Sequence, residues 1–330
     1  MRRLCVGFPG VVLIVMVCCV PVIATAEEAS HVQGNLDNFM WSISVQTSYQ
    51  YMDLSFKAPF DVGPIGVTLF HPSPLEFELD DANLWVFGVG TDVKKGRFSV
   101  FLEAKANKSK DTNVSSSFEP FWAGFDKVEW NECKLKWWSI NGGLGMDITS
   151  YLTIQAGLKV ERLNLELRDP VDDFGLLQLW QETYGDSYEG ELESKLLLPW
   201  IGIRSQVWRL NGSVRFSPYA YTDLEMPFTY EYISSPTAKI IEEEKYSFTN
   251  HGLWLEASLA FDFIKTDHWT CSLWGEGSWL WTDGRTSMKY RAVLHQSGSS
   301  PTTLLSESSS EDGEYETSTY GVGLSISYTF

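Results

Sequence analysis

Runs of carboxylates are the first residues in this sequence whose types and spacing could do chemistry. Asp172-Asp173 and Glu242-Glu243-Glu244 each place adjacent acidic side chains in polar stretches. Carboxylate oxygens of this kind are the ligands that Ca²⁺ prefers. Charged side chains are mostly solvated, however, and no Cys/His group has the spacing of metal ligands. The sequence therefore favours solvated acidic loops over a calcium site and predicts no metal.

The usual motifs of nucleotide-binding and hydrolytic sites are absent. No G-x-x-x-x-G-K-[ST], H-E-x-x-H or G-x-S-x-G occurs in the chain. Gly88-Val89-Gly90 and Gly142-Gly143-Leu144-Gly145 lie inside alternating segments, where glycine more often permits close packing or a bend than phosphate binding. We therefore expect no cofactor apart from a bound lipopolysaccharide molecule.

The N-terminus predicts export from the cytoplasm. Arg2 and Arg3 precede an apolar run, and Ala24-Thr25-Ala26 resembles a signal-peptide cleavage site. Cleavage after residue 26 leaves residues 27–330 as one domain with 23 basic and 43 acidic residues. So acidic a chain is a poor partner for nucleic acid.

The mature chain alternates between apolar and polar residues with a period of two. This pattern predicts ten strands. They cover about 39–56, 82–93, 97–109, 133–148, 151–167, 194–207, 210–225, 247–263, 268–290 and 315–330. Short turns alternate with long polar stretches at 57–81, 110–132, 168–193, 226–246 and 291–314. Such alternation is typical of an all-β, antiparallel transmembrane barrel with short periplasmic turns and long extracellular loops. Greek-key crossings in a sandwich would not sort the loops so evenly.

One face of these strands is apolar, and the other is small or charged. The apolar face is expected to contact lipid, and charged residues of both signs are expected to neutralise one another inside a narrow lumen. These lumen residues are Glu103, Lys105, Lys159, Arg204, Arg215, Glu256 and Glu276. Ten strands enclose a lumen that side chains can fill, which disfavours a diffusion pore.

Aromatic residues mark the edges of the apolar band. Trp269 and the pair Trp279 and Trp281 share the outward parity of one strand, and ten strand residues tilted by about 40° rise roughly 25 Å. This is the height of the band between the aromatic girdles of an outer-membrane barrel. The terminal "SYTF", ending at Phe330, resembles the aromatic signature that the barrel assembly machinery reads. We therefore predict a bacterial outer-membrane protein with both termini in the periplasm.

Two stretches resemble the omptins, a family of ten-stranded outer-membrane endoproteases. They are "LLLPWIGIRSQVWRLNGSVRFSPYAYTD" at 196–223 and residues 252–287, together with "SYTF". Omptins use an Asp-x-Asp pair and an Asp-x-His pair to activate a water at the extracellular mouth. The resemblance implies Asp111-Thr112-Asn113 and Asp223-Leu224-Glu225 at these positions, with Asp111 and Asp223 pointing inward. Asn113 and Glu225 replace the second aspartate and the histidine of the family pattern.

No other histidine is expected to substitute for the missing one. His251 has outward parity, and His71 and His295 lie in predicted loops. The sequence therefore predicts a surface structural or ligand-binding, adhesin-like role on an omptin-like scaffold, with an unknown extracellular ligand. The alternatives are an omptin-type endoprotease, in which Asp111, Asp223 and Glu225 are catalytic, and a narrow channel.

Outward-facing cations indicate a contact with the outer leaflet. Lys134 and Lys136 share the parity of Trp138, and Arg162 has outward parity at a similar height on the next strand. Cations hydrogen-bond strongly to phosphate, which predicts lipopolysaccharide binding. Snorkelling of rim lysines to water is the alternative. Cys133 and Cys271 are expected at opposite ends of the barrel, beyond the reach of a disulfide.

Overall fold

The computed structural model describes residues 39–58, 75–108, 110–112, 116–118, 128–172, 187–235 and 237–330. The predicted signal peptide, residues 1–26, lies outside these ranges. Within the described part of the chain, no helix is long and apolar enough to cross a membrane.

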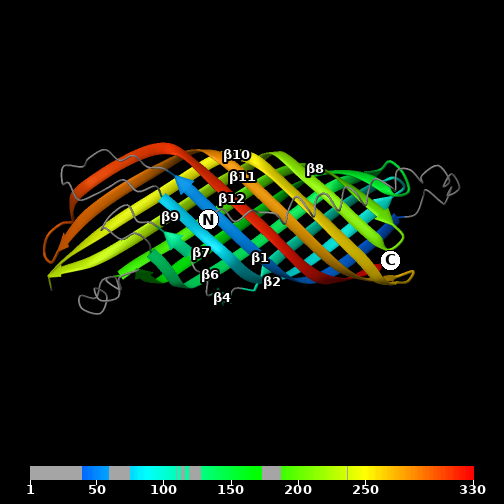
Figure 1. Cartoon of the computed structure of the whole chain (residues 1–330), viewed down its shortest axis with the longest axis horizontal. Helices are drawn as coiled ribbons and strands as arrows, with labels where there is room; N and C mark the ends of the chain where they lie inside the picture. The colour runs from blue at the N-terminus through cyan, green and yellow to red at the C-terminus, as the bar shows by residue number, and fades with distance from the viewer. Residues whose placement is uncertain are drawn as a thin grey trace, which may run out of the picture.

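Antiparallel strands close into a ring that forms a barrel (Figure 1). The segments are β1 (Phe39–Ala58), β2 (Leu75–Lys95), β3 (Phe98–Asn107), β4 (Lys110–Thr112), β5 (Ser116–Phe118), β6 (Val128–Asp147), β7 (Leu152–Asp172), β8 (Ser187–Val207), β9 (Leu210–Ser235), β10 (Ala238–Lys265), β11 (Trp269–Gln296) and β12 (Thr302–Thr329). β1 pairs with both β2 and β12, which closes the ring. The all-β, antiparallel barrel predicted from the sequence is confirmed.

Three short segments share one place in the ring. β3 and β5 both pair with β2 and with β6, and β4 pairs with β6. The twelve described segments therefore occupy ten positions around the barrel.

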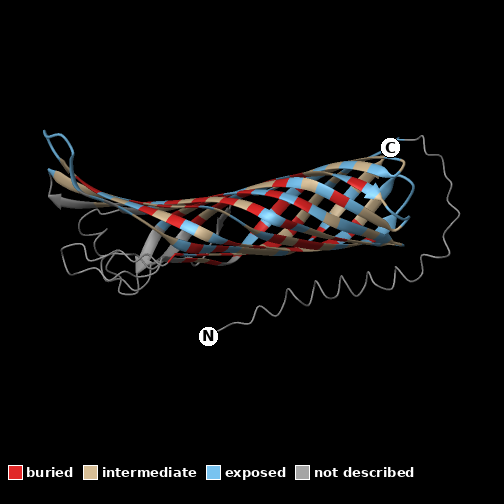
Figure 2. Cartoon of the chain, turned by 90° about the horizontal axis from the view of Figure 1, so that it is seen from above, coloured by how far each residue is buried: buried red, intermediate tan, exposed pale blue. Residues whose placement is uncertain are grey.

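The strands are longer than the sequence pattern predicts on the side opposite the short turns. β9, β10, β11 and β12 have 26, 28, 28 and 28 residues, whereas β1 has 20 and β2 has 21. The stretches 226–246 and 291–314 are therefore largely strand, and their prediction as long loops is wrong. They are hairpins that extend the sheet beyond the barrel wall (Figures 1 and 2).

The outer surface near the short turns is apolar, and the inner surface there is polar. Phe98, Leu144 and Val322 are 64%, 64% and 63% exposed on the outside. Ser48 and Gln50 are buried inside. Buried and exposed residues alternate along the strands, as the period of a strand requires (Figure 2).

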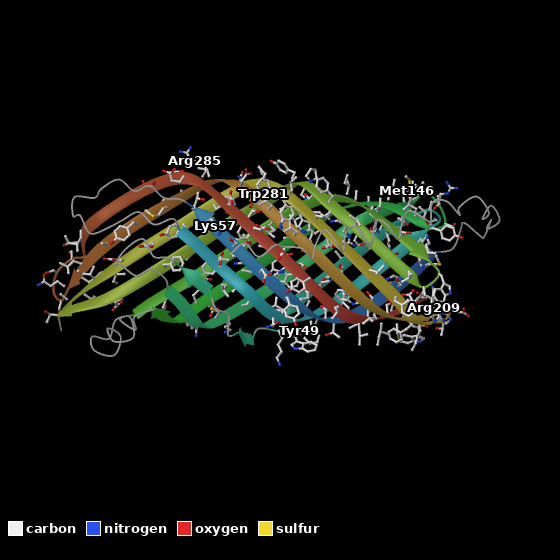
Figure 3. All side chains as sticks on the ribbon, viewed as in Figure 1. Tyr49, Lys57, Met146, Arg209, Trp281 and Arg285 are labelled. Atoms are coloured by element: carbon white, nitrogen blue, oxygen red, sulfur yellow. The ribbon has the colours of Figure 1, made fainter. Side chains whose placement is uncertain are left out.

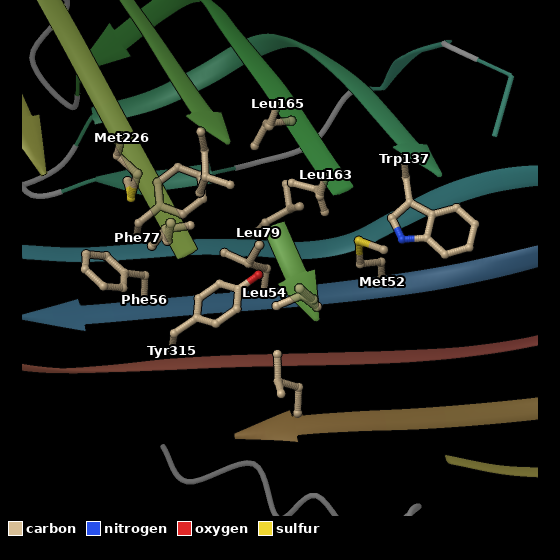
Figure 4. Close-up of a cluster of buried hydrophobic side chains, with 14 of the residues drawn as sticks. Met52, Leu54, Phe56, Phe77, Leu79, Trp137, Leu163, Leu165, Met226 and Tyr315 are labelled. Atoms are coloured by element: carbon tan, nitrogen blue, oxygen red, sulfur yellow. The ribbon is translucent and has the colours of Figure 1, made fainter. Parts of the chain in front are cut away.

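Farther from the short turns, the inner surface becomes apolar without a change of parity. On β1 the inward positions run from Ser48 and Gln50 to Met52, Leu54 and Phe56, all buried. The same change on the other strands creates a hydrophobic cluster inside the barrel (Figure 4). Here the barrel is built like a water-soluble sheet, with its apolar face inside.

Glycines inside the wall make room for large side chains. A Cβ on Gly157 would lie 2.6 Å from Cζ2 of Trp200, and a Cβ on Gly143 would lie 2.9 Å from Cζ of Phe101. Gly143 and Gly157 are register partners on β6 and β7. The glycines therefore allow the lumen to be filled by aromatic rings.

Candidate functional site

A network of ion pairs fills the lumen at the level of the apolar band. Lys105 Nζ lies 2.8 Å from Glu276 Oε2, and Lys159 Nζ lies 3.3 Å from Glu256 Oε2. Arg215 Nη1 donates to Glu256 Oε1 at 2.6 Å. Glu256 therefore neutralises two cations, one from β7 and one from β9.

Aromatic rings and amides complete the network. The ammonium of Lys105 lies 5.0 Å from the ring centroid of Trp274, and that of Lys159 lies 5.1 Å from that of Trp254. Gln50 Nε2 donates to Glu276 Oε1 at 2.7 Å. Desolvated cations over aromatic faces and amide donors to carboxylates both stabilise these largely buried charges.

The structure brings together six of the seven predicted lumen residues. Arg204 is the exception, because it lies nearer the short-turn end of β8, opposite Thr153 and Ser213, where it is exposed. Glu161 was missed by the sequence prediction and belongs to the network, with Oε2 3.1 Å from Lys159 Nζ. Its parity, two residues after Lys159 on one strand, was the signal that could have found it.

The space left inside this network is small. A cavity of about 20 Å³ is lined by the network residues together with Trp137, Ser139 and Asn141. One water molecule needs about 10–15 Å³ of such volume, so only water-sized molecules fit. The network therefore closes the lumen at this level.

A second closure lies above the network. The apolar cluster in Figure 4 includes Met52, Leu54 and Leu163 from opposite walls, and Tyr315 reaches across to donate to Ser194 Oγ at 3.1 Å. Phe248 stacks edge-on against Phe56 with ring centroids 5.8 Å apart. A polar solute moving through the barrel would have to pass both the ion pairs and this apolar plug.

The positions implied by the omptin resemblance do not face the lumen. Asp223 lies between Thr222 and Leu224, which are 0% and 1% exposed and point inward, so its carboxylate is on the outside. Its Oδ1 accepts from Thr249 Oγ1 at 3.1 Å. Glu225 also faces outward and pairs with Lys245 at 2.9 Å. The predicted inward parity of Asp223 is therefore wrong.

A β-bulge in β9 is the physical reason. Between the pairs Gly252↔Ala220 and Trp254↔Ser217, β9 carries one residue more than β10, and the β8–β9 register shifts at the same place. The extra residue reverses parity, so Arg215 and Thr222 both point inward. Proline in a strand is confined largely to edges and bulges, so Pro218 was the sequence signal.

Asp111 is also at an outward register position. It pairs with Lys134, whose neighbours Cys133 and Leu135 are buried inside. The side chain of Asp111 and the whole of Asn113 lie outside the described residues. Nothing in the described part of the chain assembles Asp111, Asp223 and Glu225 at one inner site.

The cations predicted to bind lipopolysaccharide lie on the outside but have carboxylate partners. Lys136 Nζ pairs with Glu166 Oε1, and Arg162 Nη2 lies 2.7 Å from Glu193 Oε1. Lys134 is the register partner of Glu166. A lipid phosphate would therefore have to share these cations with Glu166 and Glu193.

The described histidines that the sequence singled out, His251 and His295, both lie on strands. His251 faces outward as predicted, stacked on Tyr219 with ring centroids 4.0 Å apart and 2.8 Å from its hydroxyl oxygen. His295 lies in β11, and its prediction as a loop residue is wrong. His71 lies outside the described residues.

The predicted acidic run at 242–244 and the cysteines Cys133 and Cys271 lie on strands. Glu242, Glu243 and Glu244 belong to β10, not to a loop, and the described residues contain no group of three or more potential metal ligands. Cys133 is buried in β6, Cys271 lies on β11, and no disulfide joins the two.

A closed antiparallel ring, an outward apolar band edged with aromatic residues and a filled lumen define the outer-membrane type of β-barrel. No family model and no curated protein matches the sequence.

Several solved outer-membrane barrels resemble this chain in structure, and one of them shares its fold with a TM-score above 0.5. The outer membrane protease OmpT from Escherichia coli matches with a TM-score of 0.54 and 13% identity, over 91% of this chain and 99% of that chain. The translocator domain of the autotransporter NalP from Neisseria meningitidis matches with a TM-score of 0.39 and 10% identity, over 98% of both chains. The outer membrane protein OprG from Pseudomonas aeruginosa matches with a TM-score of 0.31 and 11% identity, over 90% of this chain and 99% of that chain. At such identities the likeness to OmpT shows a common fold and nothing about activity.

Proposed function

We propose that the protein is a closed barrel of the bacterial outer membrane that presents a projecting sheet as a structural or ligand-binding, adhesin-like surface. The double closure of the lumen by ion pairs and by the apolar plug carries this proposal. Transport of solutes needs an open path, and the cavity of about 20 Å³ within the ion-pair network has room for water-sized molecules only.

The projecting sheet supplies the surface. β9, β10, β11 and β12 stay paired far beyond the last described residue of β1, with Glu243↔Thr229, Glu243↔Arg291 and Arg291↔Ser306 in one row. Paired strands hold side chains in fixed positions, which suits recognition better than a mobile loop does. Figure 2 shows this sheet curving beyond the barrel wall.

The positions of the implied catalytic residues argue against an omptin-type protease. Asp223 and Glu225 face outward, where Asp223 accepts a hydrogen bond from Thr249 and Glu225 pairs with Lys245. A substrate in the mouth of the barrel would lie on the other side of the wall. The fold shared with OmpT supports an omptin-like scaffold without its chemistry.

Conductance across a planar lipid bilayer tests the closed barrel. The purified barrel is expected to give no unitary openings, with a general porin as the positive control for insertion. Regular openings would contradict the proposal in favour of a narrow channel. Incubation with basic peptides tests the protease, and cleavage that Asp223→Ala abolishes would overturn our ranking.

Lipopolysaccharide contact at Lys134, Lys136 and Arg162 stays a prediction. Because Glu166 and Glu193 compete for these cations, replacing the three cations with glutamine should lower retention of lipopolysaccharide during detergent purification. Replacing Glu166 and Glu193 with glutamine should raise it, since the cations are then free for phosphate. Equal retention in all three proteins would mean that no site exists here.

A further inference from the structure

The outward face of the projecting part of β11 carries a stripe of cations. Arg285, Lys289 and Arg291 are all exposed, and Ser287 between them has the same parity. Figure 3 shows Arg285 directed away from the barrel. Residues two apart on a strand are about 6.6 Å apart, so the stripe is roughly 20 Å long.

None of these three cations has a carboxylate partner in an ion pair within the described residues. Arg285 Nε donates to Ser310 Oγ at 2.6 Å instead. By contrast, Lys136, Arg162 and Lys195 on the outer wall nearer the apolar band are all paired with glutamates. In a chain with 43 acidic and 25 basic residues, three unpaired cations in one row stand out.

The neighbouring strands surround the stripe with hydroxyl groups. Lys289 has Ser308 as its register partner on β12, and Arg291 has Ser306. Two carboxylates also lie beside it, with Asp312 opposite Arg285 and Glu243 opposite Arg291. The surface therefore offers charged donors and hydroxyls, with one carboxylate beside each end of the stripe.

A like-charged pair lies at the centre of the stripe. Lys289 is directly opposite Lys245 on β10. Like charges at directly opposite positions destabilise a sheet. Lys245 pairs with Glu225 at 2.9 Å, and Glu225 lies on β9, on the side of β10 away from Lys289. An anion bound over the pair would relieve this repulsion.

The height of the stripe excludes lipid head groups as the anion. Trp281 marks the upper aromatic girdle on β11, and Lys289 lies eight residues beyond it. Eight strand residues tilted by about 45° rise roughly 19 Å. Lipid phosphates lie near the girdle, so a ligand bound at Lys289 lies well above the lipid head groups.

We propose that this stripe binds an anionic polysaccharide, whose regularly spaced sulfates or carboxylates meet Arg285, Lys289 and Arg291 while its hydroxyls hydrogen-bond to the serines. The proposal rests on the proposed function of the sheet as a ligand-binding surface and names its ligand class. A single-stranded nucleic acid fits less well, because such sites add aromatic side chains for stacking. The exposed stripe has none between Arg285 and Arg291.

Binding to immobilised heparin, as the sulfated probe, tests the proposal. The purified full-length barrel in detergent should bind at low salt. Replacing Arg285, Lys289 and Arg291 with glutamine should weaken binding at least about tenfold and lower the salt needed for elution, because charge-assisted contacts are lost. The matched control replaces Lys95, Arg209 and Lys265, at the opposite end of the barrel, with glutamine. It changes the net charge equally and should bind like wild type.

Each outcome decides between explanations. Equal weakening in both triple variants would overturn the stripe in favour of a general charge effect, and unchanged binding in both would overturn it outright. Binding of single-stranded DNA more tightly than heparin would overturn the choice of a polysaccharide. A barrel that does not conduct and does not bind heparin would contradict the polysaccharide site and leave the proposed function intact. A barrel that conducts would contradict the proposed function and leave the polysaccharide site intact. Resistance to heat unfolding during electrophoresis shows that each variant is folded.

Discussion

Replacing Glu256 with alanine is expected to lower the free energy of unfolding by about 3–5 kcal/mol. The carboxylate lies 3.3 Å from Lys159 Nζ and 2.6 Å from Arg215 Nη1, and all three side chains are largely buried. Removing it leaves two cations in the lumen with too little negative charge around them. The loss is measured by urea unfolding of the barrel in detergent micelles, followed by tryptophan fluorescence.

An exposed glutamate in an ion pair provides the matched control for Glu256. Glu225 pairs with Lys245 at 2.9 Å, but the two side chains are 44% and 45% exposed. Water and salt screen such a pair, so Glu225→Ala should cost less than about 1 kcal/mol. Equal losses of stability for the two variants would contradict the prediction, because burial would then add nothing to the contribution of the lumen ion pairs.

The lumen network could be predicted because strand parity is a local property. Glu103 and Lys105 on β3, and Glu256 on β10, follow the alternation of their own strands, and the barrel then turns them toward one another. Arg204 has the same inward parity, but its depth along the barrel decides whether it joins the network. Depth depends on strand register, which a single strand does not reveal.

The site implied by the omptin resemblance could not be placed correctly, because parity does not survive a bulge. One extra residue between Ser217 and Ala220 turned Asp223 to the outer face. Pro218 was visible in the sequence, but the pairing that shows the extra residue is a tertiary feature. An error of one residue therefore reversed the predicted role of a whole segment.

The projecting sheet was hidden by its composition. Residues 226–246 and 291–314 contain many serines, glutamates and charged residues, which resemble loops. In the structure polar residues such as Glu243 and Arg291 lie on the outside, while Met226, Phe228 and Tyr246 fill the inside. The period-two pattern was present in these stretches. Their apolar residues face inward, however, whereas those of the apolar band face outward, because the surroundings change from lipid to water.

Glu244 is expected to make the stability of the projecting sheet depend on pH near neutrality. Burial raises the pKa of Glu244 to about 7, against 4.5 for an ordinary glutamate, and the carboxylate of Glu242 acts in the same direction. The Tyr246 hydroxyl donates to Oε2 at 3.0 Å and opposes the shift, whereas Oε1 has no hydrogen-bond partner among the described residues. Phe228 and Tyr290 are its cross-strand neighbours.

The sign of the effect follows from the proton uptake. Between about pH 4.5 and pH 7 the folded protein holds a proton on Glu244 that the unfolded chain releases. The free energy of unfolding therefore falls as the pH rises through this window and loses roughly 3 kcal/mol in total. Below the window both states are protonated, and above it both are ionised, so this contribution is then constant.

A comparison with Glu244→Gln isolates this group from the other carboxylates. The glutamine variant should unfold with nearly the wild-type free energy at pH 4 and should be more stable than wild type by roughly 3 kcal/mol at pH 8. Glu243→Gln changes the next residue of the same strand, which is exposed on the outer face, and should leave the wild-type pH profile intact. A constant difference between Glu244→Gln and wild type from pH 4 to pH 8 would show that folding does not shift the pKa of Glu244. Because Glu244 lies on the inner face of the sheet whose outer face carries Arg291 and Lys289, a confirmed transition would also predict weaker heparin binding above pH 7, since the sheet that holds the cations in a row is then less stable.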